Sequence, residues 1–186
     1  MCGRFTLRNK QQVQDLTGEV IEENYNVAPS TNILTITDSP EWRKWSYSPS
    51  WAKEPMNLIN ARSESVREKP SFKESKPCLV LADGWYEWKR DGGVKQPYFF
   101  HMDHQMFYIA GIFNETGCAL LTKEANEKLS TIHNRMPVIL KHNEARDYLN
   151  GKDRFGSSLS MHVEFYPVDR MVNSPRVNNA KNIEEY

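Results

Sequence analysis

The chain of 186 residues is long enough for one domain with its own core, and its 24 Lys and Arg residues balance its 24 Asp and Glu residues. Zero net charge argues against nucleic-acid binding driven by overall charge, so any such binding must depend on a local patch. Three widely spaced cysteines without a CxxC pair argue against a disulfide framework and a zinc site, and no apolar run approaches the ~20 residues of a membrane span. We therefore expect a cytoplasmic protein with no signal peptide, no membrane contact, no metal and no cofactor.

The amino terminus carries a candidate nucleophile. Cys2 follows the initiator methionine directly, so removal of Met1 would place an α-amine and a thiol on one residue. The pKa values of these groups are about 8 and about 8.5 in free peptides, so part of each is nucleophilic at neutral pH. Such a pair condenses with an aldehyde to an imine and then to a thiazolidine, and it would also serve an N-terminal-nucleophile peptidase. Judged by position alone, an unreactive cysteine at a frayed chain end is the commoner case.

Alternation, helical spacing and turn residues predict the elements of the first 50 residues. In order, they are a strand over Arg4–Arg8, a helix over Lys10–Thr17 capped by Asn9 and Gly18, a loop over Asn24–Ser30, and strands over 33–36 and 42–47. Trp51 then follows a Pro-Ser turn. It would either pack on the core, as most lone tryptophans do, or offer a stacking face to a base.

A polar extended segment follows in the middle of the chain. Asn60, Arg62 and Glu64 alternate, so in an extended chain their side chains would fall on one side. Such a row is either a solvated edge or the polar wall of a site. The basic residues that follow, between Arg67 and Lys76, are typical of solvated surface.

A carboxylate among aromatic residues is the next candidate for chemistry. A buried strand over Cys78–Ala82 is followed by a turn and by Glu87, which lies between Tyr86 and Trp88. Desolvation raises the pKa of such a carboxyl and suits it to general acid catalysis, although an exposed Glu on an edge strand is the alternative. The Asp-Gly-Gly sequence over 91–93 then predicts a hairpin turn.

The second half of the chain predicts further strands and two short helices. The strands are expected over 98–101, 106–113, 117–122, 138–140 and 163–168. One helix is expected from Thr122 as N-cap to near His133, and the other over Asn143–Leu149. A loop is expected over Phe155–Ser160. Pro137 ends the first helix and leaves His133 in a loop beside Arg135. A histidine there is either a proton shuttle or an ordinary surface residue at a helix end.

Five motifs occur together in one order. They are Met1-Cys2-Gly3-Arg4, Ser48-Pro49-Ser50-Trp51-Ala52, Asn60-Ala61-Arg62-Ser63-Glu64, Ala82-Asp83-Gly84-Trp85-Tyr86-Glu87-Trp88 and Ile132-His133-Asn134-Arg135-Met136-Pro137. The chain thus closely resembles the SRAP family, the SOS response-associated peptidase-like proteins, over essentially its whole length. The resemblance implies a single α+β domain over residues 1–186, with a β-barrel-like antiparallel or mixed core and short flanking helices.

The resemblance also implies an activity: sensing abasic sites in single-stranded DNA and forming a covalent thiazolidine crosslink to them as part of the DNA-damage response. Cys2, after loss of Met1, would be the crosslinking nucleophile. Asn60 would orient the reacting terminus or sugar, Glu87 would be the general acid that opens the sugar, and His133 would assist proton transfer and crosslink reversal. A monomer, associated with the nucleoid when bound to DNA, is expected.

Six further residues would hold the DNA by the same resemblance: Arg4, Arg62 and Arg135 on backbone phosphates, Trp51 and Trp88 on bases, and Pro29 in a loop that wedges the strand. Two positions depart from the family pattern, since Leu81 and Trp85 stand where Pro and Phe are expected. Two other functions stay open. One is a thiol peptidase that acts on its own terminus or on other proteins. The other is a reader of single-stranded DNA or modified bases without a covalent step.

Overall fold

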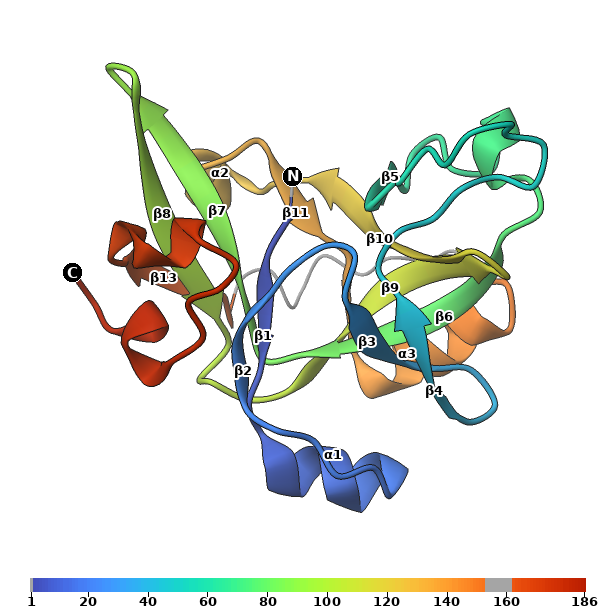
Figure 1. Cartoon of the computed structure of the whole chain (residues 1–186), viewed down its shortest axis with the longest axis horizontal. Helices are drawn as coiled ribbons and strands as arrows, with labels where there is room; N and C mark the ends of the chain where they lie inside the picture. Colours follow the sequence, from blue (N-terminus) through green and yellow to red (C-terminus); the bar gives the residue numbers. More distant parts are fainter. Residues whose placement is uncertain (1, 153–161) are drawn as a thin grey trace.

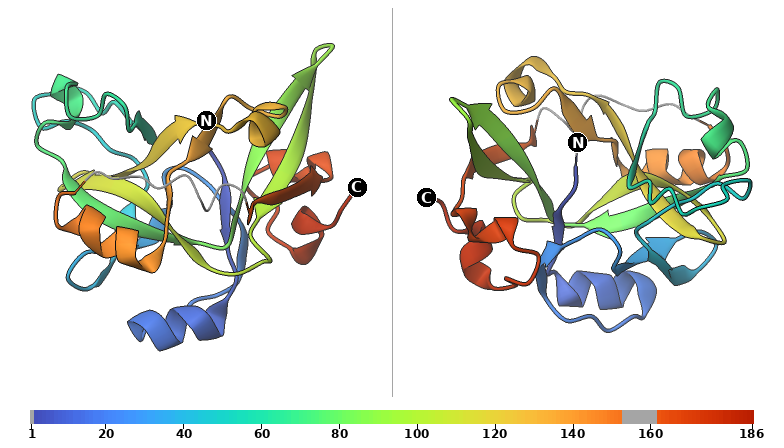
Figure 2. Two further views of the ribbon diagram at one scale, coloured as in Figure 1. Left: turned by 180° about the vertical axis from the view of Figure 1, so that it is seen from behind. Right: turned by 45° about the horizontal axis from the view of Figure 1, so that its top comes forward.

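Two open β-sheets make up most of the fold in the computed structural model, which describes residues 2–152 and 162–186 (Figure 1). The five-stranded sheet is antiparallel, and its strand order is β13 (Glu164–Pro167), β8 (Val94–His101), β7 (Gly84–Asp91), β1 (Phe5–Leu7) and β2 (Asn24–Val27). The β7–β8 hairpin extends beyond the rest of this sheet and projects from the domain (Figures 1 and 2).

The eight-stranded sheet contains the remaining strands. Its main path is β11 (Arg135–Pro137), β10 (Gly117–Glu124), β9 (Phe107–Asn114), β6 (Lys76–Ala82), β3 (Asn32–Ile36) and β4 (Pro40–Lys44). β12 (Ile139–Leu140) pairs with β9, and β5 (Asn60–Arg62) pairs in parallel with β10. The α+β class is therefore confirmed. In the described ranges the first and last strands of each sheet do not pair with each other, so neither sheet closes into the barrel that a β-barrel-like core would suggest.

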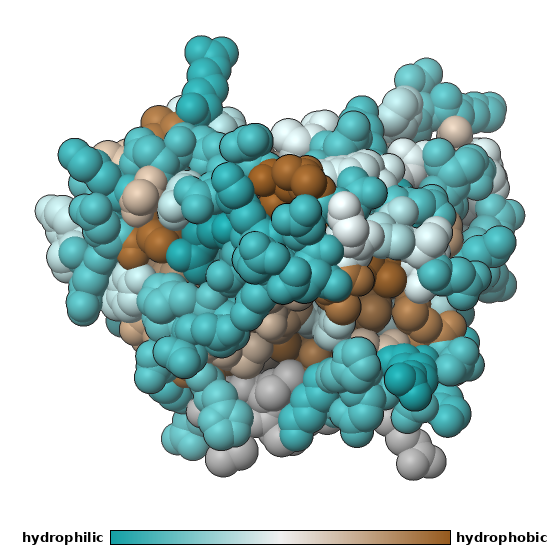
Figure 3. All heavy atoms as spheres, turned by 90° about the horizontal axis from the view of Figure 1, so that it is seen from below, coloured by the Kyte–Doolittle hydropathy of each residue, from teal (hydrophilic) through white to brown (hydrophobic). Residues whose placement is uncertain are grey.

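Short helices flank the sheets. They are α1 (Lys10–Thr17), α2 (Glu127–Ser130) and α3 (His142–Leu149), with 3-10 turns η1 (Pro70–Phe72), η3 (Arg170–Asn173) and η4 (Ala180–Ile183). α1 lies at the end of the molecule opposite the chain start, and the start of β1 lies between the β7–β8 hairpin and β10–β11 (Figures 1 and 2). Seen from the α1 side, the surface is mostly hydrophilic with apolar patches between (Figure 3), and Leu16, Val20 and Trp42 are among the exposed apolar residues.

Most predicted elements are confirmed, and two are wrong. Asn24–Val27 is a strand rather than a loop, because β2 pairs with β1 and the buried Asn26 amide donates to carbonyl groups of the C-terminal segment. The helix predicted from Thr122 begins only after Asn126, since residues 122–124 continue β10. The predicted loop over 155–160 lies outside the described residues.

The predicted C-cap of α1 is confirmed, whereas its predicted N-cap makes no capping hydrogen bond. Gly18 ends the helix in the left-handed conformation, with φ of 77°, and its N–H donates to the Gln14 carbonyl, as expected of a C-cap glycine. The Asn9 side chain makes no capping hydrogen bond to the helix. It donates instead to the carboxylate of Asp83 and to the carbonyl of His104, so it joins α1 to the neighbouring loops.

The core beneath the amino terminus is aromatic. Trp85 stacks on Phe100, with ring centroids 5.1 Å apart, and Phe5 lies 5.1 Å from Trp45. Cys2 belongs to the same buried cluster. Because each such side chain contributes ~1.5–3 kcal/mol when buried, this packing fixes the first residues of the chain against the sheets.

Candidate active site

Cys2 lies inside the protein rather than at a frayed end. It is 0% exposed, although only one residue precedes it in the sequence. Its Sγ donates to the carbonyl oxygen of Arg4 at 3.8 Å. Burial, and to a lesser degree the nearby Glu87 carboxylate, raise the pKa of the Cys2 thiol, so the resting group is protonated.

Asn60 is joined directly to Cys2. Strand β5 lies parallel to β10 and holds Asn60 opposite Leu120. From there the Asn60 Nδ2 donates to the carbonyl of Cys2 at 3.0 Å and to that of Ile59 at 3.0 Å. The Asn60 Oδ1 is buried and accepts no hydrogen bond from the described residues. An acceptor is therefore available beside the start of the chain.

Glu87 and His133 form the acid–base part of the site. Strand β7 carries Glu87, which is 2% exposed, and burial raises the pKa of this carboxyl to about 7. The Nδ1 of His133 lies 3.9 Å from Glu87 Oε2 and accepts a hydrogen bond from the Arg135 N–H at 3.0 Å. The same Nδ1 lies 3.3 Å from the Arg135 carbonyl oxygen, so each neutral tautomer finds a backbone partner there, and the tautomer protonated on Nδ1 has an Nε2 lone pair that can accept a proton. Burial lowers the pKa of His133, and the positive charges of the amino terminus and, after it, of Arg90 and Arg135 lower it further.

A cleft opens beside this pair. It has a volume of about 460 Å³ and is lined by Glu87, Trp88, Arg90, Lys95, His133 and Asn173. The indole N–H of Trp88 donates to the Asn173 side chain at 2.7 Å, which fixes the ring at the wall of the cleft. Glu87 and His133 can therefore meet a molecule from solvent, although Glu87 is buried and His133 is half-buried.

The predicted DNA-contacting arginines differ in their surroundings. Arg62 is exposed at the end of β5. The Arg4 guanidinium donates to the Asn26 side chain and to the Val172 carbonyl, both at 2.8 Å. Arg135 makes two hydrogen bonds to the carboxylate of Glu64, at 2.7 and 2.8 Å. Its charge is thus paired, and these hydrogen bonds lower the pKa of Glu64 to about 2.

The remaining predicted residues are surface features. Trp51 is 58% exposed in a turn, so its ring faces solvent rather than the core. Pro29 is half-buried in the turn between β2 and β3, next to Ser30, whose φ is 70°. In the described ranges no group of three or more His, Cys, Asp or Glu side chains is placed to hold a metal ion.

Three lining residues of the cleft, Arg90, Lys95 and Asn173, were not among the sequence candidates. Arg90 and Lys95 flank the glycine turn of the β7–β8 hairpin and face each other across its strands. The equal distance of the two residues from the Gly92-Gly93 turn was the signal that could have found them.

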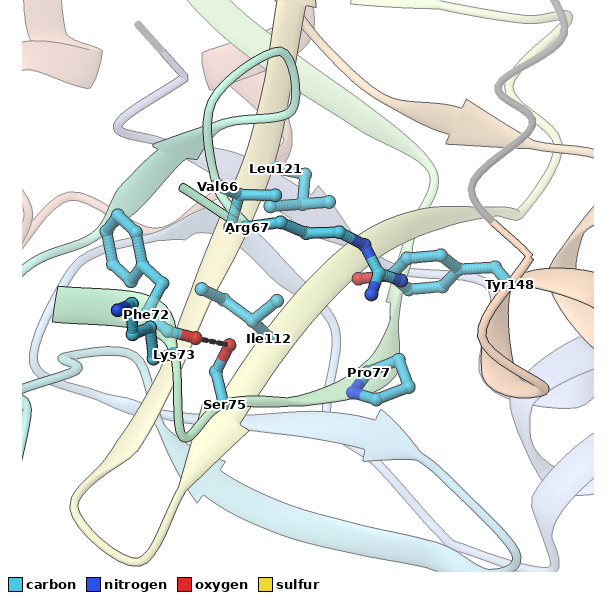
Figure 4. A pocket seen from close by; sticks show the side chains of 9 residues that line it. All are labelled: Val66, Arg67, Phe72, Lys73, Ser75, Pro77, Ile112, Leu121 and Tyr148. Carbon is cyan, nitrogen blue, oxygen red and sulfur yellow. Dashed lines mark hydrogen bonds between the residues drawn. The ribbon is translucent and has the colours of Figure 1, made fainter. Parts of the chain in front are cut away.

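Another pocket lies where the segment over residues 66–75 meets the eight-stranded sheet and α3 (Figure 4). Its lining residues are Val66, Arg67, Phe72, Lys73, Ser75, Pro77, Ile112, Leu121 and Tyr148. The Tyr148 hydroxyl donates to the Gly111 carbonyl at 2.6 Å, and Ser75 Oγ donates to the Phe72 carbonyl at 2.7 Å. None of the predicted site residues lines this pocket, so it stands apart from the site around Cys2.

The fold and the site define a class of α+β proteins with a buried cysteine at position 2, held by an asparagine amide beside a carboxyl–histidine pair. The family model described as SOS response associated peptidase (SRAP) matches residues 1–175, and the chain belongs to this family. It is 35% identical to "Abasic site processing protein YoaM" of Bacillus subtilis, over 97% of this chain and 96% of that protein. It is 30% identical to "Abasic site processing protein YedK" of Escherichia coli, over 99% of each.

Solved structures support the fold. A protein from Bacteroides thetaiotaomicron superposes with a TM-score of 0.75 and 22% identity, over 97% of this chain and 91% of its own. A phage-related protein from Bordetella bronchiseptica superposes with a TM-score of 0.65 and 27% identity, over 91% and 95%. In the part of the chain that the structure describes, no helix combines the length and the apolar character needed to cross a membrane.

Proposed function

We propose that this protein processes abasic sites in single-stranded DNA and that Cys2, once Met1 is removed, forms a covalent thiazolidine with the opened sugar. The observation that carries the proposal is the hydrogen bond of 3.0 Å from Asn60 Nδ2 to the Cys2 carbonyl, next to the Glu87–His133 pair. The names of the relatives, which are abasic site processing proteins, support the same activity.

The first step is opening of the sugar. The abasic sugar is mainly a closed hemiacetal, and opening it requires a proton on the ring oxygen and loss of the proton from the anomeric hydroxyl. Glu87, whose pKa is raised to about 7, is half protonated near neutral pH and donates the first proton. The neutral His133 accepts the second proton, and the product is a free aldehyde.

The crosslink then forms in two bond-making steps. The α-amine of Cys2 attacks the aldehyde carbon, and loss of one water gives an imine. The Cys2 sulfur attacks the imine carbon, its proton passes to the nitrogen, and a five-membered ring closes. Because burial raises the pKa of the thiol, proton removal by the Glu87 carboxylate must accompany the sulfur attack.

Single-stranded DNA would follow the surface around this site. Arg62 and the exposed Trp51 are suited to a phosphate and to base stacking. In the proposal Trp88 lies beside the abasic sugar, Pro29 wedges the strand, and Arg4 and Arg135 contact phosphates through the donors that their internal partners leave available. The protein would act on the nucleoid in the cytoplasm as a monomer.

Intact mass spectrometry tests the proposal. The purified protein is weighed before and after incubation with a single-stranded oligonucleotide that carries one abasic site. The expected result is a starting mass without methionine and an adduct equal to protein plus oligonucleotide less one water, which Cys2→Ala does not form. Absence of the adduct from protein that lacks Met1 would overturn the crosslinking role.

The family description names a peptidase, and this supports one alternative. In that case Cys2 would act as a thiol nucleophile on its own terminus or on another protein, with Glu87 and His133 as acid and base. Cleavage of an unrelated peptide that is lost in Cys2→Ala would favour this function. Persistent Met1 in Cys2→Ala, when the parent protein has lost it, would indicate autocatalytic removal.

A further inference from the structure

We propose that Arg90 and Lys95, at the tip of the β7–β8 hairpin, bind the phosphate that flanks the abasic sugar, and that the substrate is therefore an abasic site with a nucleotide on that side. This inference rests on the proposed function and adds a substrate requirement to it. Its basis is a pair of opposed cations that line the same cleft as Glu87 and His133.

The two cations are held close together by the hairpin. Arg90 pairs with Lys95 across the antiparallel strands, one residue before the turn pair Asp91 and Val94. Gly92 and Gly93 have φ values of 53° and 84°, which is the geometry of a tight two-residue turn and fixes the register of the strands. The Cβ atoms of residues directly opposite lie ~5 Å apart, so the two charges share one small volume.

This arrangement costs stability unless an anion is bound. Like charges directly opposite on two strands repel each other. Both side chains are exposed, and neither forms an ion pair within residues 2–152 and 162–186. A phosphate between them removes the repulsion and accepts hydrogen bonds from both.

The position of the pair relative to the chemistry identifies which phosphate it binds. Arg90 is close enough to His133 for its charge to lower the pKa of the imidazole. Arg90 and Lys95 line the same cleft as Glu87, His133 and Trp88. A sugar that reaches Glu87 therefore places its neighbouring phosphate, rather than a distant one, between the two cations.

The cations of the hairpin matter for DNA binding because another cation near His133 is already paired with a carboxylate. On the β11 side of His133, Arg135 is neutralised by Glu64 at 2.7 Å. Arg62 is exposed on β5, and Arg90 and Lys95 are exposed on the hairpin. None of the three forms an ion pair with another described residue, and β5 and the hairpin lie on opposite sides of the start of β1 (Figure 1). A single strand held at both places crosses the site with its abasic sugar at Glu87.

The test is single-turnover crosslinking of an internal abasic site by the parent protein and by R90A/K95A. We expect the half-saturating concentration of DNA to rise tenfold or more, while the maximal rate stays within twofold. The slope of log affinity against log salt should fall by about 0.7, the value for one phosphate on a single strand. R90K/K95R should restore both quantities. K10A/K69A, which removes two exposed cations that lie outside the cleft and form no ion pair with described residues, is the matched control.

Two further measurements make the outcome decisive. Abasic sites are placed internally, at the 5′ end and at the 3′ end of the oligonucleotide. The parent protein should crosslink the internal site better than one of the two terminal sites, the one that lacks the bound phosphate. R90A/K95A should lose this preference. Arg90→Gln should also raise the pKa of His133 measured by NMR, because a nearby positive charge is removed. Equal salt slopes and equal preferences in the parent protein and R90A/K95A would overturn the inference. If the parent protein forms no adduct at all, the proposed function fails instead. The slope of log affinity against log salt for non-covalent DNA binding, compared between the parent protein and R90A/K95A, then still tests whether Arg90 and Lys95 bind a phosphate.

Discussion

The carboxylate of Glu64 holds the guanidinium of Arg135 through two hydrogen bonds, Nη1 to Oε1 at 2.7 Å and Nη2 to Oε2 at 2.8 Å. Arg135 also donates to the Thr122 carbonyl at 2.8 Å. The guanidinium is thus oriented beside His133 but is electrically balanced. A phosphate must compete with Glu64 for this arginine, so Glu64 should limit the affinity for DNA.

Glu64→Gln should therefore strengthen DNA binding. Glutamine keeps an acceptor for Arg135 but removes the negative charge, which leaves one cation free for a phosphate. We expect the affinity for undamaged single-stranded DNA to rise about threefold to tenfold at low salt, and the salt slope to steepen by up to ~0.7. Fluorescence anisotropy at several salt concentrations measures both.

Glu68→Gln is the matched control for this effect. Glu68 is exposed in the loop that follows β5 and has no ion pair in the described ranges, so the variant changes net charge without releasing an arginine. An equal gain in both variants would mean that overall charge, rather than the freed Arg135, increases the affinity.

Asn60→Ala should slow crosslinking without unfolding the protein. The variant removes the donor that holds the Cys2 carbonyl at 3.0 Å, and one such hydrogen bond contributes ~1 kcal/mol, so the maximal rate should fall about fivefold. Asn60→Asp should be no better, because an ionised carboxylate cannot donate. Quenched adduct formation followed on denaturing gels gives the rate.

Asn114→Ala separates this effect from general loosening. The Asn114 amide also donates to a backbone carbonyl, that of Ser48 at 2.8 Å, but it lies outside the cleft. Its crosslinking rate should stay within twofold of the parent protein. A rate for Asn60→Ala that equals the rate for Asn114→Ala would contradict the positioning role of Asn60.

The sequence predicted those elements whose turn, spacing and cap residues all lie within a short segment of the chain. The β7–β8 hairpin follows from its glycine turn, and α1 follows from the spacing of Val13 and Leu16 and from Gly18. The strand at Asn24–Val27 could not be predicted in this way. The Asn26 amide is satisfied by the carbonyl groups of Val172, Ser174 and Val177, about 150 residues further along the chain, so burial of a polar side chain depends on tertiary contacts.

The site was predictable only in part for the same reason. The aromatic neighbours of Glu87 indicated a raised pKa, and the structure confirms this direction. Nothing near Cys2 or Asn60 in the sequence indicates that one holds the other, since 58 residues separate them. Position alone made Cys2 a candidate nucleophile, and the resemblance to a family gave Asn60 its role beside it. The pairing of Arg135 with Glu64 and the opposition of Arg90 and Lys95 emerge only from the fold.

Asp83→Asn should destabilise the protein strongly. The Asp83 carboxylate is 0% exposed and accepts hydrogen bonds from Thr6 Oγ1 at 2.6 Å, from Arg8 Nε at 2.8 Å and from the Asn9 N–H at 3.0 Å. It thus joins β1, which follows Cys2, to the start of α1. Neutralising one partner of a buried pair leaves the other charge uncompensated, and we expect a loss of ~3–5 kcal/mol of unfolding free energy.

Urea denaturation measures this loss, with Asp38→Asn as the control. Asp38 is exposed in the turn between β3 and β4, so its replacement should change the unfolding free energy by less than ~0.5 kcal/mol. A loss below ~1 kcal/mol for Asp83→Asn would show that the buried pair contributes little to the stability of this domain.

Glu87→Gln should abolish most crosslinking and yet stabilise the protein at alkaline pH. Burial raises the folded-state pKa of Glu87 to about 7, whereas the pKa of an unfolded glutamate is about 4.3. The folded protein binds the extra proton between these values, so the stability that Glu87 contributes is complete below pH ~4 and is lost as pH rises through about 7. Glutamine mimics the protonated carboxyl and does not ionise.

The difference in unfolding free energy between Glu87→Gln and the parent protein should thus be near zero at pH 4 and reach ~3 kcal/mol at pH 8 in favour of the variant. His133 lies 3.9 Å from Glu87 and titrates together with it, so the same comparison is repeated in a His133→Ala background, where Glu87 is the one member of this pair that titrates. Loss of the general acid should slow adduct formation by about 10²–10⁴. A stability difference that is the same at pH 4 and pH 8 would contradict the raised pKa, and with it the reason why this carboxyl can donate a proton to the sugar near neutral pH.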